Sequence, residues 1–174
     1  MNITYNPHRI TFTDDGGTEK EYTASGDVKI SYDKGVLKVT ADGTPIKNVK
    51  LYFTRERKEN SYIYADTWER GYGDLCLRQG DADGAWYMIE YDGASAFCIG
   101  VKTGPNAFCR WEYKGSEIIF TADIKNGSHG VVLCGRTLTA AEIVALETEG
   151  SFDECAAAQK NPSKALCESI NSGF

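Results

Sequence analysis

The residues best suited to chemistry lie in one ten-residue run, Asp66-Thr67-Trp68-Glu69-Arg70-Gly71-Tyr72-Gly73-Asp74-Leu75. The run combines two aromatic rings with carboxylates and a guanidinium, and its two glycines allow the backbone to bend and to approach a ligand closely. An aromatic face can stack on a sugar ring while the charged groups hydrogen-bond its hydroxyls. The alternative interpretation is an irregular loop in which Arg70 only pairs with Glu69.

The other acidic residues do not form a recognisable catalytic pair. A glycosidase needs two facing carboxyl groups at a set separation, and nothing in the sequence places the pairs Asp14/Asp15 or Asp81/Asp83 in that way. The segment Asp81–Gly84 predicts a solvated turn, and it lacks the terminal Glu of a calcium loop. We therefore expect no catalytic residue in this chain.

Metal and cofactor sites are not indicated either. The two histidines, His8 and His129, are isolated in the sequence, and we expect both at the surface. The six cysteines are widely and irregularly spaced, with no C-x-x-C pair, so no zinc site is indicated. Because Cys98, Cys109 and Cys134 have apolar neighbours, we expect reduced thiols that behave as small core residues.

The segment Gly100–Arg110 contains a Gly-x-x-x-Gly-Pro pattern that faintly resembles a phosphate-binding loop. It has no Gly-Lys-Ser/Thr ending and no following helix pattern, so a nucleotide site is poorly supported. Residues 103–106 predict a turn between two strands, and Lys102 is the polar side chain of most interest here. The aromatics Trp86, Tyr87 and Trp111 alternate with apolar residues, which favours core positions over a lectin-like platform.

The length and the charge of the chain exclude several classes of protein. A chain of 174 residues has the size of one globular domain, and its net charge of −6 argues against a nucleic-acid partner. No apolar run approaches the roughly 18 residues of a membrane span. The N-terminus has no apolar segment typical of a signal peptide, which predicts a cytoplasmic location.

The elements that must position these residues are mostly strands. Short runs rich in β-branched and aromatic residues predict a mainly β protein, an antiparallel β-sandwich. The expected strands are Val28–Tyr32, Val36–Ala41, Val49–Thr54, Ser61–Ala65, Trp86–Tyr91, Ala96–Lys102, Phe108–Tyr113, Glu117–Ile124 and Gly130–Cys134. Glycine-containing turn signals separate them, at Asp33-Lys34-Gly35, Ala41-Asp42-Gly43, Asp92-Gly93, Lys114-Gly115 and Asn126-Gly127. Residues 1–25 are expected to form either a hairpin or a loose arm.

The C-terminal part differs in pattern. Ser151 and Glu154 have the spacing of a capping box, which predicts a short helix over Phe152–Lys160. We therefore divide the chain into a β-sandwich domain, 1–150, and a helical tail or linker, 151–174. The segment Thr139–Glu147 is ambiguous, because it has the features of a helix start followed by those of a strand.

Three ordered blocks resemble the N-terminal domain of bacterial melibiase-like (α-galactosidase) enzymes of glycoside hydrolase family 36. The run Asp66–Leu75 is similar to the family's D-A-W-E-R-G-Y-G-D-L, and Gly100–Trp111 to its G-V-K-T-G-P-x-A-F-C-F-W. Asp123–Gly127 and Gly135–Leu138 match its D-V-R-N-G and G-R-x-L. The resemblance covers roughly residues 50 to 150 and favours a strand for Thr139–Glu147. Beyond Asn161 the sequence departs from the family pattern.

The resemblance implies a non-catalytic accessory domain of a glycoside hydrolase. In such enzymes the catalytic residues lie on a following (β/α)₈ barrel of about 250 residues, which this sequence does not contain. Trp68 would then stack on a sugar, Asp66 or Asp74 would accept hydroxyl hydrogen bonds, and Arg70 would donate them. Tyr72 belongs to the same expected site. The domain would assist sugar binding, pack on the barrel or support oligomer formation.

The alternative function is an independent carbohydrate-binding or lectin-like module without catalysis. Both hypotheses predict that this chain alone hydrolyses nothing. The two hypotheses differ in whether this chain has a catalytic barrel as its partner.

Overall fold

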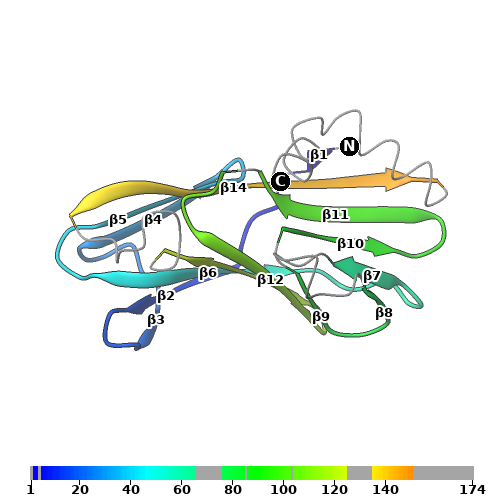
Figure 1. Cartoon of the computed structure of the whole chain (residues 1–174), viewed down its shortest axis with the longest axis horizontal. Coiled ribbons are helices and arrows are strands. Elements are labelled where there is room, and N and C mark those ends of the chain that lie inside the picture. The colour runs from blue at the N-terminus through cyan, green and yellow to red at the C-terminus, as the bar shows by residue number, and fades with distance from the viewer. Residues whose placement is uncertain are drawn as a thin grey trace.

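The computed structural model describes residues 2–3, 5–65, 76–84, 86–102, 104–124 and 135–150. These residues form two antiparallel β-sheets, and no helix occurs among them. The mainly β class is confirmed, and the two sheets have a sandwich-like arrangement (Figure 1). The helix expected at 152–160, the tail 151–174 and the strand expected at 130–134 lie outside the described residues.

The larger sheet has eight strands and the smaller one six. Along the larger sheet lie β4 (Val28–Asp33), β5 (Val36–Ala41), β14 (Arg136–Glu149), β11 (Ser95–Val101), β10 (Tyr87–Tyr91), β7 (Tyr62–Ala65) and β8 (Cys76–Arg78), with β1 (Asn2–Ile3) paired to β14. Along the smaller sheet lie β3 (Glu19–Glu21), β2 (Arg9–Asp14), β6 (Ile46–Thr54), β13 (Glu117–Asp123), β12 (Phe108–Lys114) and β9 (Ala82–Gly84).

One hydrophobic core contains buried side chains from both sheets. Successive side chains of a strand point to opposite faces, so every second residue enters this core. In β12 the buried residues are Cys109, Trp111 and Tyr113, as the alternating pattern predicts for Trp111. Phe108 and Arg110, on either side of Cys109 in sequence, are exposed on the outer face. The described residues include no helix long and apolar enough to cross a membrane.

Three predicted turns connect neighbouring strands of hairpins. In the turn between β4 and β5, Lys34 and Gly35 have φ angles of 48° and 87°, as a type I′ turn requires. Asp92-Gly93 joins β10 to β11 and Lys114-Gly115 joins β12 to β13. The signal at Ala41-Asp42-Gly43 has a different role, because it links β5 to β6 in the other sheet.

β14 joins the two halves of the larger sheet. Residues 136–142 pair with β5, and residues 143–149 pair with β11. The register with β5 shifts between Thr139 and Ala141, and this irregularity accompanies the change of partner strand. The ambiguous segment is therefore a strand, as the resemblance favours.

Two other expectations are resolved near the ends of the smaller sheet. Residues 9–21 form a hairpin of β2 and β3 rather than a loose arm. The predicted turn Asp81–Gly84 is wrong for its last three residues, because they form the edge strand β9 against β12. The Asp83-Gly84 pair suggested a turn, but an edge strand also tolerates a glycine where another strand approaches its backbone closely.

Candidate functional site

The five candidate sugar-binding residues, Asp66, Trp68, Arg70, Tyr72 and Asp74, lie outside the described residues. The strands on either side of them are described. β7 and β8 pair antiparallel, with Ala65 opposite Cys76, and β8 forms one edge of the eight-stranded sheet. The run therefore connects two neighbouring strands at that edge, and its exposure and contacts stay predictions.

The described residues at the base of this connection are closely packed. The rings of Tyr64 and Tyr87 lie 6.1 Å apart between their centroids. A Cβ added to Gly84 of β9 would lie 3.1 Å from the Cβ of Ala65 and 3.0 Å from the carbonyl oxygen of Tyr87. This close approach brings the edge of the smaller sheet against β7 and β10, so the strands that flank the run have a rigid base.

The second block of the resemblance forms the connection from β11 to β12, as the predicted turn between two strands requires. Asn106 is held against β14, because its backbone N–H donates to the Ala140 carbonyl and its side-chain amide to the Thr139 carbonyl. Lys102 forms an ion pair with Glu142 of β14. These contacts give Lys102 and Asn106 a structural role at the irregularity of β14. Thr103 is outside the described residues.

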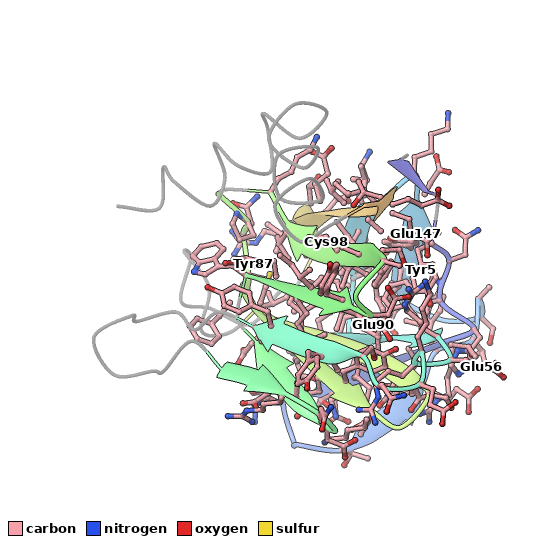
Figure 2. All side chains as sticks on the ribbon, turned by 90° about the vertical axis from the view of Figure 1, so that its right-hand side faces the viewer. Tyr5, Glu56, Tyr87, Glu90, Cys98 and Glu147 are labelled. Atoms are coloured by element: carbon pink, nitrogen blue, oxygen red, sulfur yellow. The ribbon has the colours of Figure 1, made fainter. Side chains whose placement is uncertain are left out.

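A polar network that the sequence did not indicate lies at the opposite end of β10 from Tyr87 (Figure 2). Glu90 is only 3% exposed and its carboxylate is surrounded by donors. One oxygen accepts from the Ser61 hydroxyl and from the Lys58 backbone N–H, each at 2.9 Å. The other accepts from Arg55 Nε at 2.8 Å.

Arg55 connects this buried carboxylate to the surface. Its guanidinium also donates to Glu147 at 2.9 Å, and it stacks over the Phe97 ring at 3.6 Å from the centroid. Burial by itself would lower the pKa of Arg55, but the hydrogen bonds to Glu90 and Glu147 outweigh it and raise that pKa. Burial also raises the pKa of the Tyr113 phenol, whose hydroxyl lies 3.5 Å from Glu90.

A second ion pair fixes the β10–β11 turn beside this network. Lys58 Nζ lies 2.7 Å from Asp92, and Asp92 also accepts backbone hydrogen bonds from Ala94 and Ser95. The Lys58 ammonium, followed by these backbone N–H groups, holds the pKa of the Asp92 carboxyl well below its usual range. Asp92 is therefore an ionised anchor of the turn rather than a proton donor.

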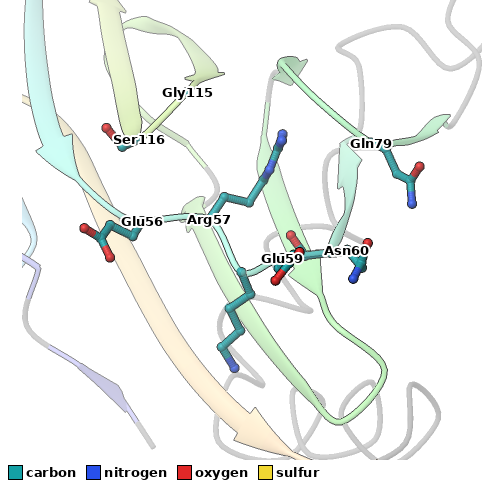
Figure 3. A pocket seen from close by; sticks show the side chains of 9 residues that line it. Glu56, Arg57, Glu59, Asn60, Gln79, Gly115 and Ser116 are labelled. Carbon is teal, nitrogen blue, oxygen red and sulfur yellow. The ribbon is translucent and has the colours of Figure 1, made fainter.

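Two pockets flank Lys58. The first, of about 660 Å³, is lined by polar residues that precede β7 and by Gln79, Gly115 and Ser116 (Figure 3). The second, of about 600 Å³, is lined by Arg55, Ser95, Glu147 and neighbouring residues. Both have the size of small-ligand sites, but neither contains an aromatic side chain that could stack on a sugar.

The contacts of the Glu90 carboxylate are those of a structural group. Arg55, the Lys58 backbone, Ser61 and Tyr113 all direct donors at this carboxylate, as expected for a structural anion. Within the described residues, no group of three or more His, Cys, Asp or Glu side chains could hold a metal ion. His8 is at the surface as expected, 3.2 Å from Glu117, while His129 is outside the described part.

No model of a known protein family matches this chain, and no curated protein matches it either.

Proposed function

We propose that this chain is a non-catalytic β-sandwich domain of an α-galactosidase-like glycosidase, assisting sugar binding and packing on a catalytic barrel. Its sugar-binding residues are Trp68, Arg70, Tyr72, Asp66 and Asp74. Trp68 stacks on the sugar ring, the two aspartates accept hydrogen bonds from hydroxyls, and Arg70 donates them.

The observation that carries the proposal is the composition of the run together with its position between β7 and β8. Ala65 and Cys76 face each other across the ladder, so both ends of the run start from one edge of the sheet. A short connection on a rigid scaffold is a common position for binding residues. The hydrogen bonds from four donors to Glu90 support a structural rather than a catalytic role for this buried acid.

The alternative, an independent carbohydrate-binding or lectin-like module, draws support from the large core that both sheets share. Such a core allows a domain to fold without a barrel. The two functions share the sugar site and differ in their partners, a barrel in one case and glycan alone in the other. Oligomer formation is compatible with both.

Trp68→Ala tests the sugar site. We expect the variant to lose affinity for raffinose by on the order of 1–3 kcal/mol, the scale of one lost stacking face in another ligand class. Calorimetric titration of the full chain measures this for the independent module. The KM of a glycosidase carrying this domain measures it for the accessory domain.

Tyr62→Ala is the matched control, because Tyr62 is an exposed aromatic of β7 that precedes the run and lies outside it. It should leave binding unchanged. If Trp68→Ala instead unfolds the domain, as judged by circular dichroism, Trp68 is a core residue and the sugar-binding role fails. Hydrolysis of an aryl α-galactoside that persists through repeated purification of this chain would contradict the non-catalytic role.

A further inference from the structure

The outer face of the six-stranded sheet has a regular grid of side chains. On β6, β13 and β12 the outward residues alternate with core residues, so they form rows across the strands. One row is Thr13, Asn48, Asp123 and Phe108, and the next is Thr11, Lys50, Thr121 and Arg110.

On the half of this face over β2 and β3, the polar side chains hydrogen-bond to one another. Glu19 accepts hydrogen bonds from Thr11 and Lys50, each at 2.8 Å, and from the Tyr52 hydroxyl at 3.1 Å. The Arg9 guanidinium covers the Tyr52 ring at 3.7 Å from its centroid. The Lys50 hydrogen bond is the main reason why the pKa of Glu19 is lowered. These groups have little capacity left for a ligand.

The rest of this face, over β12, β13 and the Asn48 end of β6, is different. Thr121 is only 6% exposed, yet its hydroxyl has no hydrogen-bond partner, and the buried side-chain oxygen of Asn48 has none either. Buried polar atoms are normally paired, so these two atoms keep hydrogen-bonding capacity that the described residues do not use. Asn48 pairs with Asp123, two residues along β13 from Thr121, so the two orphaned atoms belong to adjacent rows.

The same half presents an aromatic ring to solvent. Phe108 is 41% exposed, and among the described large hydrophobic residues only Tyr62 is also exposed. Phe108 lies opposite Asp123 and two residues from Arg110 on its own strand. An exposed ring beside unsatisfied hydrogen-bonding groups is the combination that binds a sugar, which has one apolar face and a rim of hydroxyls.

We propose that Phe108, Arg110, Thr121 and Asn48, here called the open patch, form a second carbohydrate-binding surface on the six-stranded sheet. The inference rests on the proposed carbohydrate-binding function but not on the run around Trp68. A neutral sugar fits better than an anion, because Asp123 lies between Phe108 and Asn48 in their row and the chain has a net charge of −6. One exposed ring among polar groups also offers too little apolar area for a protein partner.

Because the Thr121 hydroxyl is buried, a neighbouring side chain has to move before a sugar can reach it, and Arg110 is the candidate that its position and weak contacts favour. The two residues are directly opposite each other across the β12–β13 ladder. The nearest carboxylate to the Arg110 guanidinium is that of Glu112, at 4.0 Å, which is too long for a firm hydrogen bond. Lys50, on the other side of Thr121, is held by Glu19. Of the two side chains that flank Thr121, Lys50 is therefore fixed and Arg110 is free to move.

Amide chemical shifts of the full chain, followed by NMR during titration with raffinose at millimolar concentration, test the patch. We expect shifts in β12 and β13. Phe108→Ala should weaken this binding at least tenfold, and Thr121→Val should weaken it severalfold, because it removes only the hydroxyl. Tyr62→Ala, which removes the other exposed ring, should leave it unchanged.

Trp68→Ala separates this inference from the proposed site. If the open patch binds independently, the shifts in β12 and β13 persist in Trp68→Ala while any shifts in the amides flanking the run, in β7 and β8, disappear. Absence of shifts in β12 and β13 with wild-type protein, or unchanged binding by a folded Phe108→Ala variant, would overturn the open patch whatever Trp68 does.

Discussion

At the scale of single residues, the buried carboxylate of Glu90 shows how a polar group becomes part of a core. Its two oxygens receive donors from Arg55, from Ser61 and from the backbone of Lys58, and a Tyr113 hydroxyl lies nearby. A buried ion pair gains little net free energy, but removing one partner leaves an uncompensated charge in the protein interior. The network therefore matters for stability mainly because it is complete.

Glu90→Gln should lower the free energy of unfolding by about 3 kcal/mol, because it leaves the largely buried Arg55 guanidinium with only Glu147 as its counter-charge. Urea unfolding at neutral pH measures the change. Glu147→Gln is the matched control, since the Glu147 side chain is 50% exposed and an exposed pair contributes less than about 1 kcal/mol. Equal losses in the two variants would show that Glu90 has no special role.

At the scale of elements, the β4–β5 hairpin depends on one glycine for two separate reasons. Gly35 has a positive φ of 87°, which other L-residues adopt at a cost. It also lies against β14, where an added Cβ would be 2.2 Å from the carbonyl oxygen of Ile143. The backbone of Gly35 in turn accepts a hydrogen bond from the Ile143 N–H at 2.7 Å. The hairpin and β14 are therefore joined at this point by backbone contacts.

Gly35→Ala should cost more than about 2 kcal/mol, because backbone strain and a backbone clash add together. Gly93→Ala separates the backbone strain from the steric clash, since Gly93 has a φ of 94° but no atom within 4 Å of an added Cβ. We expect it to cost only about 1 kcal/mol. Thermal unfolding of both variants measures the difference. Similar losses would mean that the contact between Gly35 and Ile143 of β14 relaxes easily.

At the scale of the whole molecule, the core includes thiols. Cys98 and Cys109 are buried and reduced, and burial raises the pKa of Cys109 far above its usual range. A thiol held in its neutral form is a poor nucleophile and is slow to form a disulfide. Cys109 lies in the core shared by the two sheets, and Cys98 packs with Leu146 in a second, smaller cluster, so both behave as the small apolar residues that the sequence predicts.

Addition of a reductant should therefore leave the melting temperature nearly unchanged. Loss of a native disulfide would instead cost about 2–5 kcal/mol, which is several degrees for a domain of this size. Differential scanning calorimetry with and without reductant makes the comparison. A drop of many degrees would show that cysteines outside the described residues are bridged, and that the expected reducing compartment is wrong.

The sequence by itself determined most of the strands. Alternating patterns place Val36–Ala41 and Phe108–Tyr113 within one residue of β5 and β12, because side-chain alternation and burial are local properties of a strand. The glycine turns at Gly35, Gly93 and Gly115 were predictable for a similar reason, since their positive φ angles are set within a few residues. The short edge strand β9 was predicted to be a turn, because its three residues carry no hydrophobic period.

Only the tertiary structure decided which strands neighbour one another and which side chains meet. β14 changes partner from β5 to β11 along its length, a choice that depends on packing between segments about a hundred residues apart. Arg55, Glu90 and Glu147 likewise come from three distant strands or their ends, so no spacing in the sequence links them. The unpaired side-chain oxygens of Thr121 and Asn48 also follow from the tertiary structure. Whether a polar atom finds a partner depends on the neighbouring strands, which local sequence does not specify.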